Sequence, residues 1–118
     1  MNYQKLCSLV LGLELQIRSV YVYHNNGELL AGGMREGISS LLPTVELTKS
    51  IHNTLLRWKT RELLYPFLGA GKYSLTEYEQ VKRITFPLKN YAVLVVGMEV
   101  AVKHDIIIEK ILRLIEEP

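Results

Sequence analysis

Cysteine is nearly absent from this chain: Cys7 is the single one among 118 residues. One cysteine forms no intramolecular disulfide, so a small secreted scaffold held together by disulfides is excluded. Cys7 lies in an apolar helical pattern, where a thiol behaves as a small core hydrophobe. We therefore expect an intracellular protein that is stabilised by its core.

An excess of charge of one sign is also missing, because 14 Lys and Arg residues are balanced by 12 Asp and Glu residues, for a formal net charge of +2. No uncharged run reaches the roughly 18 residues of a membrane span. Residues 1–13 carry an apolar stretch after a lysine, but the spacing is amphipathic and no A-x-A-like cleavage site follows. These absences argue against a nucleic-acid binder and a membrane span, and favour a cytoplasmic protein.

What the chain does have is a hydrophobic content of 48%, enough for one core in a single domain over residues 1–118. The periodicity of the apolar residues predicts alternating helices and strands. In order, these are a helix over 2–14, strands over 17–24 and 28–34, a helix from 43 to 64 that Pro66 stops, two strands within 73–88 divided near 79–80, a strand over 91–98 and a helix that opens at 104.

The order is therefore α-β-β-α-β-β-β-α, with hairpins on both sides of a long central helix. Short hairpins around one helical crossover are typical of an α+β fold with an antiparallel five-stranded sheet. Residues 91–98 are almost entirely apolar, which predicts the most buried strand.

The central helix has more apolar surface than one sheet face needs, since Leu47, Leu56 and Leu63 lie beside its main stripe. We expect this helix to meet its own copy in an isologous homodimer, with large side chains as anchors and two arginines on one face orienting a partner. The alternative is that Trp58 closes the core of the monomer. The predicted interface residues are Leu47, Ile51, Leu55, Trp58, Arg57 and Arg61.

With this order of elements, the chain resembles the roadblock/LC7 group of profilin-like and longin-like sandwiches. The resemblance covers the whole length but depends on order and hydrophobic pattern. It implies a homodimer formed along the central helix and an edge strand, acting as a scaffold or regulator of small Ras-like GTPases. Fold alone does not determine function.

Three segments carry a more specific resemblance: GELLAGGMREG at residues 27–37, VKRITFP at 81–87 and HDIIIEKIL at 104–112. They are similar to sequence motifs of a family of small archaeal proteins, chiefly of the thaumarchaeal, ammonia-oxidising lineage. The likeness spans roughly residues 17–115 and implies membership of a family without an established activity.

The glycine-rich part of the first segment is the candidate ligand site. Glycines open the backbone, and Arg35 is suited to donate to a phosphate or carboxylate. The residues of this predicted site are Gly32, Gly33, Arg35 and Glu36. The P-loop pattern is absent, so a strand end with a bulge is the alternative.

Metal and catalytic chemistry have little support in the residue pattern. The three histidines and one cysteine show no zinc-site spacing, and no nucleophile, base and orienting group can be assembled. We expect no cofactor and no enzyme activity. The sequence thus predicts a homodimeric, non-catalytic scaffold or regulator that acts through protein contacts, with a small Ras-like GTPase as a candidate partner. The alternative is a sensor of a small anion or metabolite.

Overall fold

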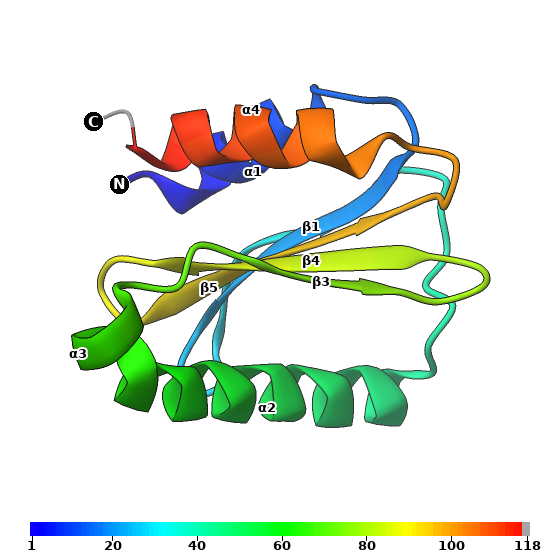
Figure 1. Ribbon diagram of the computed structural model, residues 1–118. Helices are drawn as coiled ribbons and strands as arrows, with labels where there is room; N and C mark the ends of the chain where they lie inside the picture. Colours follow the sequence, from blue (N-terminus) through cyan, green and yellow to red (C-terminus); the bar gives the residue numbers. More distant parts are fainter. Residues whose placement is uncertain (117–118) are drawn as a thin grey trace.

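The computed structural model describes residues 1–116, and its elements follow the expected order (Figure 1). They are α1 (Tyr3–Leu11), β1 (Ile17–His24), β2 (Leu29–Met34), α2 (Thr44–Arg61), a 3-10 turn (Glu62–Leu64), α3 (Tyr65–Leu68), β3 (Ser74–Glu77), β4 (Lys82–Leu88), β5 (Ala92–Met98) and α4 (His104–Glu116). The predicted α-β-β-α-β-β-β-α order is confirmed, with the 3-10 turn and α3 added after α2.

The five strands form one antiparallel sheet in the order β2-β1-β5-β4-β3. Every residue of β5 is buried, which confirms that residues 92–98 form the innermost strand. Strands β2 and β3 are the two edges, and α2 connects them by crossing one face of the sheet.

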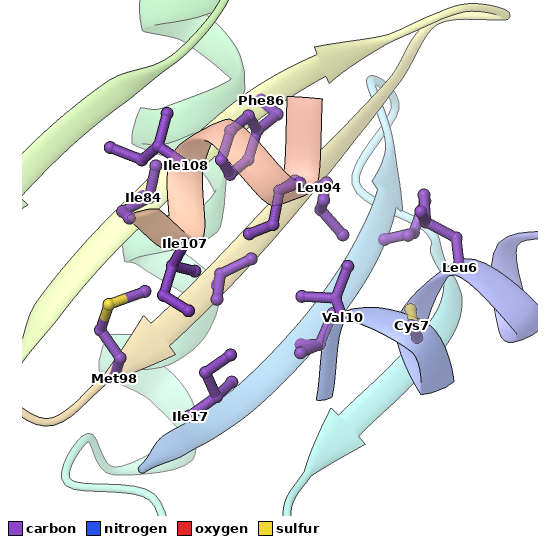
Figure 2. Close-up of a cluster of buried hydrophobic side chains, with 14 of the residues drawn as sticks. Leu6, Cys7, Val10, Ile17, Ile84, Phe86, Leu94, Met98, Ile107 and Ile108 are labelled. Atoms are coloured by element: carbon purple, nitrogen blue, oxygen red, sulfur yellow. The ribbon is translucent and has the colours of Figure 1, made fainter. Parts of the chain in front are cut away.

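Helices cover both faces of the sheet: α1 and α4 lie on one face and α2 on the other (Figure 1). The α1/α4 face holds the larger core, in which apolar side chains from both helices meet β1, β4 and β5 (Figure 2). The α2 face holds a smaller cluster, made of Ile51, Leu55 and Trp58 against Tyr23, Val93 and Val95. The second cluster is where α2 is attached to the sheet.

Among the boundaries that differ from the prediction, three have clear local reasons. Helix α1 ends at Leu11 rather than at residue 14, because Gly12 follows as its C-cap and donates to the Ser8 carbonyl at 3.1 Å. Pro66 does not stop the central helix, whose regular part already ends at Arg61. Pro66 instead lies at the start of α3, a position where its missing N–H removes no intrahelical hydrogen bond.

The third boundary is the start of β5. Asn90 and Tyr91 both have positive φ, at 62° and 60°, so Tyr91 belongs to the hairpin turn before the strand. Its side chain is exposed rather than buried in a strand.

Within residues 1–116, no helix is both long enough and apolar enough to cross a membrane.

Candidate functional site

The predicted interface residues of α2 divide between its two sides. Ile51, Leu55 and Trp58 are buried against the sheet of their own chain, and Leu47 packs half-buried at the border of the same cluster. These side chains therefore do not face outward toward a second copy. Arg57 is exposed.

Trp58 is held in the core by its polar atom as well as by its ring. Its indole Nε1 donates to Thr85 Oγ1 at 2.8 Å. The Arg61 guanidinium lies over the ring, 4.7 Å from its centroid, a cation–π contact. Of the two interpretations of Trp58, the structure shows the one in which it closes the core of the monomer.

The predicted ligand site lies at the end of β2, and two of its residues have structural roles there. Arg35 donates through Nε to the Ile17 carbonyl at 2.7 Å, and through a terminal nitrogen to Leu11 and Glu14 carbonyls at 2.7 and 3.0 Å. It thereby satisfies the carbonyl of Leu11 at the end of α1, which has no helical partner, and two carbonyls of the segment that leads into β1. Gly32 has φ of 90°, and a Cβ there would lie 2.0 Å from the Val20 carbonyl oxygen.

The other two residues of that site have more open surroundings. Gly33 has nothing within 4 Å of the place a Cβ would take, and Glu36 is exposed. None of the four lines the cleft described next. Ligand binding by these residues stays a prediction.

A cleft of about 490 Å³ lies between α2 and the sheet. Its floor is a row of cross-strand neighbours in which Thr76 of β3 pairs with Arg83 of β4, and Arg83 with Gly97 of β5. Gly97 in turn pairs with Ser19 of β1. Gly97 has no side chain and that of Ser19 is small, so the side chains of these two residues do not fill the space between this row and α2.

The next row on the same face explains where the cleft ends. There Thr85, Val95 and Tyr21 are cross-strand neighbours with larger side chains. Val95 is buried in the α2 cluster, and Thr85 accepts the hydrogen bond from Trp58. The helix therefore packs tightly over this row and leaves space over the preceding one.

Basic side chains outnumber acidic ones in the lining of the cleft. Arg18, Lys49, Arg57, Arg61 and Arg83 line it, whereas Glu46 is the one carboxylate among its lining residues. Lys49 lies 3.5 Å from Glu46, and Arg18 lies 2.8 Å from Glu99, which does not line the cleft. Across residues 1–116, the other three arginines have no carboxylate oxygen within 4.0 Å.

Arg83 is the deepest of these three. It is half-buried on the floor and donates to the Ser50 hydroxyl of α2. Burial lowers the pKa of Arg83, an effect opposed by neighbouring tyrosines, Tyr78 first among them. An arginine remains charged even so. The cleft therefore contains a partly desolvated cation whose hydrogen-bond partner is a neutral hydroxyl.

The segments 81–87 and 104–112 meet at a buried lysine. The Lys82 side chain is 7% exposed, and its ammonium donates to the Val102 carbonyl at 2.7 Å. It also lies 2.9 Å from His104 Nδ1 at the start of α4. These contacts of Lys82 connect β4 to the start of α4, on the face of the sheet opposite the cleft.

No group of three or more His, Cys, Asp or Glu side chains gathers as a metal site in the part of the chain that the structure describes.

Sequence reasoning missed Arg83 and Ser50 as cleft residues. A usable signal was present in β4, where Ile84 and Phe86 alternate with Arg83 and Thr85. Alternation places Arg83 and Thr85 on one face of the sheet, but it does not show which helix covers that face.

Solved structures with the same architecture define the class of fold. The Roadblock/LC7 domain from Streptomyces avermitilis superposes with a TM-score of 0.70 at 9% identity, covering 96% of this chain and 91% of that one. MglB from Myxococcus xanthus gives 0.66 at 14% identity, with 93% and 88% covered. A structure described as "MglB with tetrameric arrangement" gives 0.66 at 14%, with 95% and 86% covered. The chain has the roadblock/LC7 fold.

The sequence itself assigns the family. Residues 1–117 match the model of the family described as "Family of unknown function (DUF6659)", and the chain belongs to that family. No protein with a curated description matches the chain in sequence.

Proposed function

We propose that the chain is a cytoplasmic, non-catalytic scaffold or regulatory protein that forms a homodimer and binds a small Ras-like GTPase. The fold supports the class of function, because the resemblance to roadblock/LC7 proteins implies this role. The observation that supports the homodimer is a set of exposed apolar side chains, which we call the outer apolar surface. It consists of Leu56, Leu63, Phe67 and Leu68.

The outer apolar surface extends from α2 through the 3-10 turn into α3. Its side chains are between 62% and 83% exposed. Large apolar side chains gathered on the surface are typical of a protein–protein contact. Leu56 and Leu63 are two of the three residues that sequence periodicity placed beside the main stripe of the helix; the third, Leu47, packs against the α2 cluster.

An open sheet edge lies next to this helix. Arg61 of α2 is 3.4 Å from Ser74 of β3, which places the end of the helix beside the edge strand. An edge strand exposes backbone groups that another strand can pair with. The opposite edge, β2, is partly covered, since Gln4 of α1 accepts from the Gly32 N–H at 3.4 Å.

The proposed homodimer therefore joins the outer apolar surface and the β3 edge to their copies about a two-fold axis. A chain of the same fold self-associates, as the MglB structure described as tetrameric indicates. Arg57, exposed on α2, is the residue we expect to orient an acidic partner. Ile51, Leu55 and Trp58 support the interface by fixing α2 on the sheet.

Sedimentation velocity tests the homodimer. We expect the wild-type chain to sediment as a dimer at about 50 μM, and Leu56→Glu to raise the dimer Kd about 100-fold, because a carboxylate would be desolvated in the interface. The control is Leu15→Glu, at a residue 85% exposed after α1. A wild-type monomer at this concentration, or equal effects of both variants, would contradict the homodimer.

Titration with purified small Ras-like GTPases from the same organism tests the partner. We expect one of them to bind with an affinity that differs at least about tenfold between its GDP form and a form loaded with a GTP analogue. Absence of binding by every such GTPase would contradict the regulatory role without affecting the homodimer.

A further inference from the structure

The cleft under α2 contains positive charge without matching negative charge. Arg57, Arg61 and Arg83 line it, and across residues 1–116 none has a carboxylate within 4.0 Å. Arg83 is half-buried, and a cation withdrawn from water is costly unless it is paired. An anion that entered the cleft would provide the missing pairing.

The arginines approach the cleft from two walls. Arg83 comes from β4 on the floor, whereas Arg57 and Arg61 come from α2. Because Arg57 and Arg61 are four residues apart on a helix, their side chains lie on the same face. A ligand between α2 and the sheet would therefore meet guanidinium groups from both sides.

Hydroxyl groups surround these guanidiniums. Ser50 of α2 and Ser74 and Thr76 of β3 line the cleft, and Tyr78 lies at the turn after β3. Hydroxyls donate to anionic oxygens, and guanidiniums bind the oxygens of phosphate in pairs. The single lining carboxylate, Glu46, lies beside Lys49. The lining thus suits a phosphate group in both charge and hydrogen bonding.

We propose that this cleft binds a phosphorylated small molecule, with Arg57 and Arg83 holding its phosphate. The volume of about 490 Å³ is in the range of sites for small organic ligands, and exceeds what inorganic phosphate alone would fill. Tyr21 adds an aromatic surface beside the arginines for the rest of the ligand. The site differs from the Gly32 to Glu36 segment, and it is formed within one chain, so it does not depend on the proposed homodimer.

Isothermal titration calorimetry of the full chain at fixed ionic strength tests the site. The probes are inorganic phosphate, pyrophosphate, AMP and ADP, with adenosine as the probe without phosphate. We expect AMP or ADP to bind more tightly than inorganic phosphate and pyrophosphate, adenosine not to bind, and the affinity to fall as salt rises. If inorganic phosphate or pyrophosphate bound as tightly as AMP and ADP, the proposal of an organic ligand would be wrong, because the cleft would then be a site for anions alone.

Two variants locate the site. We expect Arg83→Gln and Arg57→Gln each to weaken binding of the tightest probe about 10- to 100-fold, the loss typical of one charge-assisted contact. Arg57 is exposed, so its variant keeps the test valid if Arg83→Gln fails to fold. The matched control is Arg113→Gln on α4, where Arg113 pairs with Glu109 at 2.5 Å across the molecule from the cleft.

Sedimentation of the same samples separates this proposal from the homodimer. Absence of heat with every phosphate probe at millimolar concentration would overturn the proposal, whatever the oligomeric state. Arginine variants that change only the dimer Kd would also overturn it, since they would show that an acidic group of a second copy fills the cleft.

Discussion

Replacing Trp58 by alanine should lower the free energy of unfolding by about 3–5 kcal/mol, the usual cost of removing a buried tryptophan. Its side chain is 4% exposed and packs in the cluster that attaches α2 to the sheet. The substitution also removes the donor to Thr85 and the ring beneath Arg61. Chemical denaturation followed by far-UV circular dichroism measures the loss, because the variant has no tryptophan to report fluorescence.

Two further variants assign the effect to burial. Leu56→Ala changes a large apolar residue of the same helix that is 62% exposed, and should cost no more than about 1 kcal/mol in the monomer. Trp58→Phe keeps a ring but leaves the Thr85 hydroxyl without its donor, so an intermediate loss is expected. If Trp58→Ala left the stability unchanged but abolished self-association, Trp58 would be an interface residue and the packing of α2 described above would be wrong.

Gly32→Ala should cost about 3 kcal/mol or more. An alanine at φ of 90° is strained, and its Cβ would meet the Val20 carbonyl oxygen at 2.0 Å, so β1 and β2 would have to separate locally. Gly33→Ala is the matched control in the same strand, because nothing lies within 4 Å of its Cβ position. We expect a change within about 0.5 kcal/mol for that variant. Thermal or urea unfolding of both proteins measures the difference.

This pair of variants also tests the two interpretations of the glycine segment. A large loss for Gly32→Ala alone supports a backbone requirement at the end of β2. Equal stability of both variants, together with the loss of a bound small molecule, would instead support the predicted ligand site.

The order of elements could be predicted because it depends on local patterns. Asn25, Asn26 and Gly27 favour a tight turn, and the apolar run of residues 92–98 requires cover on both faces of the sheet. The resemblance to the roadblock/LC7 group follows from that order, and the superpositions confirm the fold.

Which side of α2 packs against the sheet could not be predicted in the same way. Its stripe includes Ile51, Leu55 and Trp58, but Leu56 and Leu63 make a second apolar side. Periodicity identifies both sides and does not say which one the sheet covers. Trp58 is buried by contacts with strands that are distant in the sequence, among them the hydrogen bond to Thr85 of β4.

The cleft is likewise a property of strand register. It exists because Gly97 and Ser19, on β5 and β1, fall opposite each other in one row beneath α2. The role of Arg35 also depends on tertiary contacts, since two of the carbonyls that it binds belong to Leu11, the last residue of α1, and to Glu14 in the loop that follows. The sequence does not reveal the strand register, so it shows where the arginines lie along the chain but not which of them line the same cleft.

Selective labelling of new cysteines is feasible in this protein. The native Cys7 is buried, and burial raises its pKa to about 11. Its thiol is therefore protonated and unreactive near pH 8. A single cysteine introduced at an exposed strand edge would be the reactive thiol of the chain.

Oxidative cross-linking of such variants tests the proposed homodimer most directly. Cysteine is introduced at one position of β3 at a time, Ser74 through Glu77, and at Leu30 of the opposite edge β2 as the control. Paired strands lie about 4.8 Å apart, so at least one β3 variant should form a covalent dimer in high yield at low micromolar concentration. The Leu30→Cys variant should remain monomeric under denaturing conditions. Cross-linking through Leu30→Cys alone, or through none of the five variants, would contradict a homodimer joined at the β3 edge.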